Sequence, residues 1–192
     1  MFFYLYMILD VFSRKIVGWE VHSEENGFNA AILVQKAIFS EACVLEPPVL
    51  HSDNGSPQKG STLRAKLEAL GIAPSYSRPH VSNDNPYSES QFKTLKYCPA
   101  FPDRFGSIQD SRSFCQDFFP WYNKEHRHCG IGLMTPESVH YGLAKSLYEH
   151  RKTVLEAAFK KTPNRFKGKK PQPPQLPKTA WINPPSSVVV GA

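Results

Sequence analysis

The hydrophobic positions of the chain change their period within the first forty residues. Residues 2–9 and 15–22 are rich in aromatic and β-branched side chains and flank the turn 10–14, which predicts two antiparallel strands. From residue 26 onward the apolar residues recur at helical spacing, at Ala30, Leu33, Val34, Ala37 and Ile38. This stripe predicts an amphipathic helix that packs on the sheet.

The alternation of strand and helix continues through the middle of the chain. Residues 49–52 predict a short strand, and Leu63, Leu67 and Leu70 mark a second helix that Gly71 can end in a left-handed cap. Residues 72–76 predict a further strand. Strands and helices in this order indicate an α/β fold.

Turn-forming residues from 78 to 85 predict a loop before a third helix. Asn85 is expected at the N-cap of that helix and Pro86 at its first position. Two later helices are predicted, one around 108–122 and one that starts after Thr135 as N-cap and continues to about residue 159.

Lys and Pro dominate after residue 161. Residues 167–174 predict a semi-rigid extended linker, and residues 181–184 predict one short docked strand. We therefore expect one core domain over 1–160 and a Pro/Lys-rich tail over 161–192.

Composition narrows the class of protein only moderately. The 192 residues are 41% hydrophobic, enough for one sizeable core, and the formal net charge of +6 favours a polyanionic partner. The four cysteines show no C-x-x-C spacing and no signal peptide is evident, which fits a reducing cytoplasm. The apolar run 2–9 is far shorter than the roughly 20 residues of a membrane-spanning helix.

Two acidic residues are the strongest candidates for chemistry. Asp53 follows a predicted strand in His-Ser-Asp-Asn-Gly-Ser-Pro, and Glu89 lies in the first turn of a predicted helix, with 35 residues between them. Carboxylates suit a hard divalent cation such as Mg²⁺. The structural alternatives are an ordinary Asp-Asn-Gly turn and a solvated helix residue that favours the N-terminal dipole.

These motifs resemble the integrase catalytic core of bacterial insertion-sequence transposases, in the retroviral-integrase superfamily with its Asp, Asp-35-Glu triad. The resemblance rests on residues 51–57, on 81–90, and on a C-terminal block running from Trp121-Tyr122-Asn123 through Thr135-Pro136 to Gly142. It implies a ribonuclease-H-like mixed sheet flanked by helices. It also implies DNA integration or transposition, with metal-dependent end cleavage and strand transfer in the intact protein.

The resemblance also implies ligands and partners. Asp53 and Glu89 would be catalytic and would hold two Mg²⁺ ions, for which Mn²⁺ can substitute. Lys93, Lys96 and Arg127 would bind DNA. The expected partners are transposon ends and target DNA, further copies of the protein, and a separate or upstream helix-turn-helix segment, with no membrane. The expected location is the bacterial cytoplasm, at the nucleoid.

The chain departs from the family pattern at its start. The family's first catalytic aspartate lies on a first strand, whereas residues 3–10 match the second strand, so Asp10 corresponds to the aspartate that ends that strand. We therefore expect a core that lacks its first strand, an incomplete triad with Asp10 outside it, and an open question of whether this chain is itself an active enzyme. The alternatives are a catalytically dead remnant that binds DNA or transposase and inhibits it, and a simple nuclease.

Three further patterns have simpler structural explanations. Glu89 and Lys93 can form a surface pair one helical turn apart, worth about 0.2 to 0.5 kcal/mol. His126, His128 and Cys129 lack the second spaced pair that a structural zinc site needs. Asp84 lies in an Asn/Asp/Pro loop and is expected to cap locally.

Overall fold

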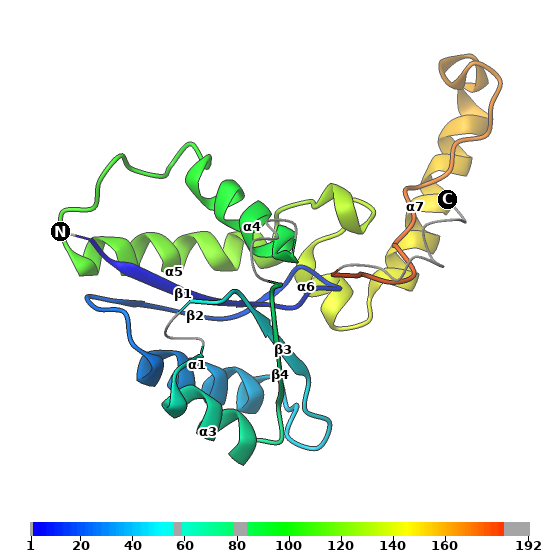
Figure 1. Ribbon diagram of the computed structural model, residues 1–192. Helices are drawn as coiled ribbons and strands as arrows, with labels where there is room; N and C mark the ends of the chain where they lie inside the picture. Colours follow the sequence, from blue (N-terminus) through cyan, green and yellow to red (C-terminus); the bar gives the residue numbers. More distant parts are fainter. Residues whose placement is uncertain (1, 56–58, 79–83, 183–192) are drawn as a thin grey trace. The chain divides into compact units, whose positions relative to one another are not determined.

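The computed structural model describes residues 2–55, 59–78 and 84–182 and divides the chain into two compact units. Unit 1 comprises Met1–Asp10, Ile16–Phe118 and Trp181–Ala192, and unit 2 comprises Val11–Lys15 and Phe119–Ala180. Figure 1 shows the order of the elements. Among the described residues, no helix combines the length and apolar character that crossing a bilayer requires.

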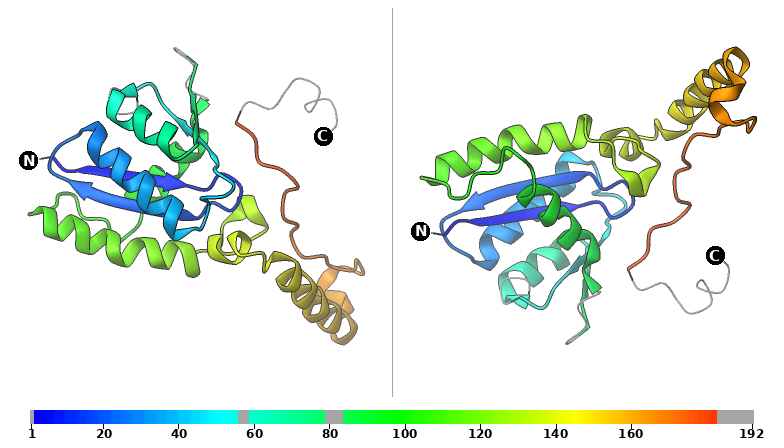
Figure 2. Two further views of the ribbon diagram at one scale, coloured as in Figure 1. Left: turned by 90° about the horizontal axis from the view of Figure 1, so that it is seen from below. Right: turned by 90° about the horizontal axis from the view of Figure 1, so that it is seen from above.

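Unit 1 begins with the expected antiparallel hairpin. Strand β1, Tyr4–Leu9, pairs with β2, Ile16–His22, and the register shifts by one residue between Ile8 and Leu9. A side chain at Gly18 would meet Leu33 Cδ1 at 3.1 Å, so glycine lets the following helix approach the hairpin closely. Figure 2 shows that helix on one face of the two strands, in front of them in the left view.

Helix α1, Gly27–Ser40, confirms the apolar stripe. The Asn26 side chain caps it by accepting a hydrogen bond from Asn29 N at 2.9 Å. Tyr6 connects β1 to the same cap, since its hydroxyl donates to Asn26 O at 3.1 Å and accepts from Asn26 N at 2.7 Å. All five residues of the predicted stripe are buried, and so is Ala31.

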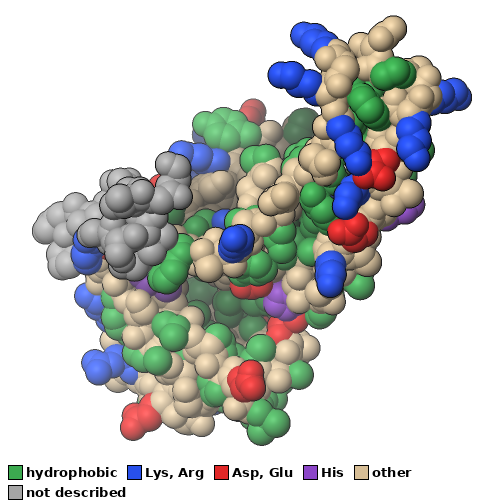
Figure 3. Space-filling model, turned by 90° about the vertical axis from the view of Figure 1, so that its right-hand side faces the viewer, with side chains coloured by type: hydrophobic (Ala, Val, Ile, Leu, Met, Phe, Trp, Pro, Cys, Tyr) green, Lys and Arg blue, Asp and Glu red, His purple; other side chains and the backbone are tan. Residues whose placement is uncertain are grey.

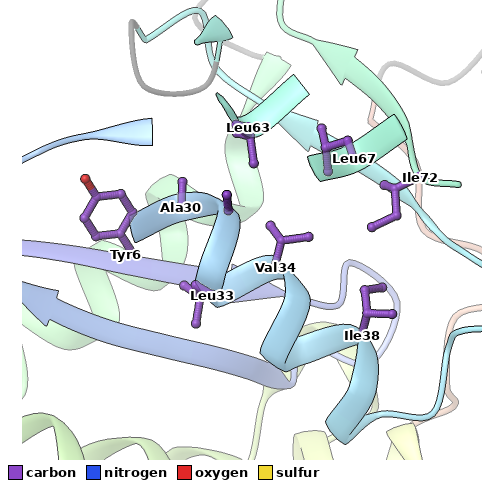
Figure 4. Packing of buried hydrophobic residues seen from close by; sticks show 9 residues of the cluster. Tyr6, Ala30, Leu33, Val34, Ile38, Leu63, Leu67 and Ile72 are labelled. Atoms are coloured by element: carbon purple, nitrogen blue, oxygen red, sulfur yellow. The ribbon is translucent and has the colours of Figure 1, made fainter. Parts of the chain in front are cut away.

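The second half of the unit 1 core follows the predicted strand–helix–strand order. Strand β3, Val49–Ser52, is parallel to β4, Ala73–Tyr76, and helix α3, Ser61–Ala69, connects them. The helix ends in a Schellman motif, with Gly71 at φ +68° and with Ile72 N donating to Leu67 O at 2.9 Å. Figure 4 shows Leu63, Leu67 and Ile72 facing the stripe of α1.

Two further helices complete unit 1, the second only as far as Phe118. Helix α4, Pro86–Lys96, begins as predicted, with Asn85 at the N-cap and Pro86 at the first position. Helix α5, Ile108–Lys124, is longer than predicted and contains Pro120. Its Arg112 side chain donates to Val21 O at 2.8 and 3.1 Å, which attaches the helix to β2.

The helix predicted from Thr135 to about residue 159 is wrong as one element. Thr135 occupies an N-cap position, but the chain forms α6, Pro136–His140, and α7, Ala144–Lys161. Between them Gly142 adopts φ +77°, outside the right-handed helical region. The apolar period continues across this break, which is why the pattern alone did not reveal it.

Unit 2 has a small core of its own, formed by Ile131, Met134 and Val139, with Leu176 from the tail packed against it. It also contains two 3₁₀ helices, η2, Cys129–Ile131, and η3, Pro163–Phe166. The extended linker predicted at 167–174 is wrong at its start, because Lys167 and Gly168 form a turn with φ of +51° and +71°. Residues 169–180 form no helix or strand. However, the tail is docked rather than a free spacer, because Lys170 pairs with Glu156 at 2.9 Å and Leu176 enters the core.

The predicted strand at 181–184 is not formed at Trp181 and Ile182, and residues 183 and 184 lie outside the described part of the chain. Trp181 O instead accepts a hydrogen bond from the Tyr87 hydroxyl at 2.9 Å. The α/β class is confirmed. Within the described residues the strands form two pairs, β1–β2 and β3–β4, where one mixed sheet was expected, because no backbone ladder joins the pairs.

Candidate functional site

Asp53 lies directly after β3, at the point where the strand pair ends. Its side chain is exposed, and Oδ1 accepts a hydrogen bond from Gly55 N at 3.0 Å. This is the local turn that the structural alternative predicts. A single hydrogen bond to one oxygen still leaves a carboxylate able to bind a cation, so the turn and a metal role are compatible.

Hydrogen bonds hold this turn beside the chain that leaves β4. Ser77 N donates to Ser52 O at 3.0 Å, which continues the parallel pairing one residue past β4. The Asn54 side-chain amide donates to Ser77 O at 2.7 Å. The residues on both sides of Asp53 are therefore anchored to the same residue of the neighbouring segment.

Asp84 is the most heavily bonded acidic residue near this turn. It is 1% exposed, and its carboxylate accepts from Arg78 N at 2.7 Å and from the Arg78 guanidinium at two points, both 2.9 Å. The hydrogen bonds that its guanidinium donates to Asp84 raise the pKa of Arg78. The prediction of a local structural role for Asp84 is confirmed, and the arginine is the partner that the sequence did not reveal.

His51 connects β3 to the start of α4. Its Nε2 lies 2.9 Å from Asp84 O, and its Nδ1 lies 3.0 Å from Ser75 Oγ. A carbonyl oxygen only accepts, so Nε2 carries the hydrogen and, in the neutral ring, Nδ1 accepts from the Ser75 hydroxyl. We call His51, Arg78 and Asp84 the latch. His51 belongs to the motif at residues 51–57, but the motif by itself predicts no role for this side chain.

The latch connects the two chain segments that carry the candidate carboxylates. Asp53 lies two residues beyond His51, and Glu89 lies five residues beyond Asp84, in the first turn of α4. Among the described residues, no group of three or more His, Cys, Asp or Glu is arranged to hold a metal ion. Shared coordination by Asp53 and Glu89 stays a prediction, as does the position of Asp10 outside their site.

The exposed face of α4 carries the charges that the sequence places there. Glu89, Lys93 and Lys96 are all exposed. Within the described residues no ion pair joins Glu89 to Lys93, so the surface pair is not formed. The Glu89 carboxylate and both ammonium groups are available to a ligand.

The remaining candidates lie in unit 2. Arg127 is exposed, and because the two units are described separately, its role beside the carboxylates stays a prediction. His126 stacks on Tyr122 at 5.3 Å and meets His128 edge to face at 6.1 Å. Burial lowers the pKa of His126, and burial followed by Arg14 and His126 lowers that of His128. These contacts give the two histidines a packing role.

Two family models, both described as Integrase core domain, match residues 1–82 and 70–136 of this chain. The chain belongs to the integrase core family. This integrase core is 31% identical over 142 residues to the transposase for insertion sequence element IS904 of Lactococcus lactis, covering 70% of this chain and 53% of that protein. It is 27% identical over 133 residues to the putative transposase InsK for IS150 of Escherichia coli, covering 69% and 47%.

Solved structures agree on the fold of the integrase core. The catalytic core domain of BIV integrase superposes with a TM-score of 0.51 at 20% identity, covering 75% of this chain and 89% of that one. A chain of the simian T-cell lymphotropic virus intasome in complex with PP2A regulatory subunit B56 gamma gives 0.52 at 20% identity, covering 72% and 48%. These likenesses confirm the ribonuclease-H-like fold expected from the motifs. The chain spans about half the length of the transposases it matches.

Proposed function

We propose that this integrase core is part of a transposase that acts in DNA transposition, with metal-dependent end cleavage and strand transfer in the intact protein. The observation that carries the proposal is the latch, which joins the strand end before Asp53 to the start of the helix that bears Glu89. Insertion-sequence transposases among the relatives supply the class of reaction.

The two carboxylates fit a divalent cation by their chemistry. Asp53 and Glu89 offer exposed oxygen atoms, and Mg²⁺ is commonly held by one or two carboxylates together with waters and substrate phosphates. This mode of binding does not require a third protein ligand, so the absence of a three-residue cluster among the described residues is compatible with it. A bound cation would polarise the phosphate and stabilise the leaving oxygen.

The residues around the carboxylates divide the other tasks. Lys93 and Lys96 extend from the same helix as Glu89 and neutralise phosphate charge. His51 and Arg78 orient the start of α4 through Asp84. The partners in this proposal are transposon ends, target DNA, further copies of the protein and a helix-turn-helix segment, in the bacterial cytoplasm.

Metal binding tests the carboxylates directly. Titration of the 192-residue chain with Mn²⁺ is followed by calorimetry for the wild type, Asp53→Asn and Glu89→Gln. We expect each substitution to weaken the affinity at least about tenfold. Glu68→Gln, at an exposed position of α3, is the matched control and should leave it unchanged. Equal affinity for Mn²⁺ in all four proteins would contradict a metal site at Asp53 and Glu89.

DNA binding tests the face of α4 separately. Lys93→Ala with Lys96→Ala should lower the affinity for DNA and make its salt dependence shallower by about 1 to 2 units of slope. Glu89→Gln should not weaken DNA binding, because a carboxylate makes no favourable contact with phosphate. An unchanged slope in the double lysine variant would show that both lysines are solvated surface residues that do not contact DNA.

A further inference from the structure

A dense group of positive charges lies where α7 ends. Residues 160–170, which we call the basic turn, contain no acidic residue and include six exposed cations: Lys160, Lys161, Arg165, Lys167, Lys169 and Lys170. Figure 3 shows Lys and Arg side chains gathered around this end of unit 2, at the upper right of the view. Its residues 167–170 belong to the stretch for which the sequence predicts an extended linker.

The basic turn is folded. Helix η3 follows α7 directly, and the backbone then reverses at Lys167 and Gly168, with φ of +51° and +71°. Lys169 N donates to Phe166 O at 3.0 Å, and the Phe166 ring packs edge to face on Phe159 at 5.9 Å. The cations are therefore held close together, instead of spreading apart as they would on a flexible tail.

Most of these charges form no ion pair within the described residues. Lys170 pairs with Glu156 at 2.9 Å, while the other five make no ion pair with any residue in the described part of the chain. Like charges held in one turn repel one another, and this repulsion opposes the folding of the turn. An anionic partner would remove it, and the same contact would release counterions from a polyanion.

The surroundings of the basic turn identify the kind of polyanion. Phe159 and Phe166 pack against each other and are only partly exposed, so no ring stands out as a platform for stacking unpaired bases. No exposed large apolar side chain accompanies the cations, as a membrane-surface helix would require. Both observations favour contact with phosphates alone, and therefore the outer backbone of a duplex.

We propose that the basic turn binds the phosphate backbone of duplex DNA without regard to sequence. This site is separate from Lys93 and Lys96 on α4 and, through its choice of DNA as the polyanion, rests on the proposed function. Its role is to hold flanking or target DNA rather than to position the reacting phosphate.

Salt-dependent binding of the 192-residue chain to a fluorescent duplex of arbitrary sequence tests the proposal. The test variant replaces Lys160, Lys161, Arg165 and Lys167 with Gln. Between about 50 and 200 mM salt, each lost phosphate contact lowers the slope by about 0.9, so we expect a change of about 2 to 4 units. The control variant replaces Arg64, Arg104, Lys124 and Lys145 with Gln, which removes the same charge from exposed positions elsewhere.

The comparison of variants decides the result. A charge-retaining variant with Lys160→Arg, Lys161→Arg and Lys167→Arg should keep the wild-type slope. Circular dichroism checks that each variant is folded. Equal slope changes in the test and control variants would overturn the proposal. The proposal would also be overturned if the test variant bound DNA as the wild type does but no longer bound vesicles that contain phosphatidylserine. If Lys93→Ala with Lys96→Ala alters the salt slope of DNA binding while the test variant leaves it unchanged, that result would support the proposed function and contradict DNA binding by the basic turn.

Discussion

At the scale of single residues, the latch is the feature of the structure that the sequence pattern did not predict. Asp84 is buried and accepts three hydrogen bonds, whereas Asp53 and Glu89 are exposed. A buried carboxylate with several donors is a structural element, and exposed carboxylates are available to ligands. The three acidic residues therefore have different tasks, although all lie in polar segments of similar composition.

Removal of the Asp84 carboxylate should destabilise unit 1. Asp84→Ala leaves Arg78 N and the guanidinium without their acceptor, and we expect the free energy of unfolding to fall by about 2 to 4 kcal/mol. Asp84→Asn keeps one acceptor oxygen and should cost less. Urea unfolding measures both, with Asp103→Ala at an exposed loop position as the control. A loss no larger than that of the control would show that the latch contributes little.

The partly buried histidines His126 and His128 of unit 2 predict a dependence of stability on pH. Because the pKa of His126 and of His128 is lowered from 6.5 on folding, the unfolded chain binds protons more readily. Their contribution to stability is therefore complete above about pH 6.5 and is lost as the pH falls below it toward the folded pKa.

Urea unfolding at several pH values between about 7.5 and 5 checks this prediction across the ordinary pKa of histidine. His128→Gln should reduce the loss of stability on acidification, whereas His150→Gln, at an exposed position of α7, should leave it as in the wild type. The same pH dependence in the wild type and both variants would exclude His128 as its source.

At the scale of elements, the tail and the loop before α6 depend on each other. Gly132 adopts φ +66°, and a Cβ there would lie 2.9 Å from Gln175 O. Arg151 on α7 donates to Gly132 O at 2.9 Å and to Leu133 O at 2.7 Å, which holds the same loop from another side. The tail backbone therefore lies close against a loop that Arg151 holds in place, which explains why a Pro-rich segment without regular structure is nevertheless docked.

A pair of glycine substitutions separates backbone strain from this contact. Gly142→Ala places a Cβ in open space at φ +77°, so it should cost only the left-handed conformation, about 1 to 2 kcal/mol. Gly132→Ala carries the same strain and also displaces the tail backbone, which adds about 1 to 3 kcal/mol. Thermal unfolding measures both, and trypsin cleavage after Lys178 should accelerate only in Gly132→Ala. Equal behaviour of the two variants would mean that the tail contact is weak.

At the scale of the whole molecule, each unit has a hydrophobic cluster of its own among the described residues, and one helix is common to both units. The cluster around α1 and α3 belongs to unit 1, and the cluster around Ile131 belongs to unit 2. Helix α5 runs through the boundary between Phe118 and Phe119. Because each unit has its own hydrophobic cluster, we expect two unfolding transitions. The continuous helix α5 couples the two units, so the midpoints of these transitions should lie close together.

Tryptophan fluorescence can resolve the two units. With Trp181 replaced by Phe, Trp19→Phe leaves Trp121 to report on unit 2, and Trp121→Phe leaves Trp19 to report on unit 1. Gly132→Ala should lower the urea midpoint of the Trp121 signal and leave that of Trp19 nearly unchanged. Equal shifts of both signals would show that the chain unfolds as one cooperative unit.

The sequence by itself determined the local elements and the family. Pro86 and Gly71 mark helix ends through the conformation of residues near them in the chain, and the stripe of α1 depends only on helical period, so these predictions were confirmed. The motifs around Asp53 and Glu89 identified the integrase core because they are contiguous in the chain.

Only the tertiary structure decided which distant residues meet. His51 and Asp84 are 33 positions apart, and Gly132 and Gln175 are further separated still, so no local period or spacing predicts their contact. The break between α6 and α7 and the docking of the tail depend on contacts of this kind. Local propensities act along the chain, whereas burial and hydrogen bonding between separate segments are settled when the chain packs.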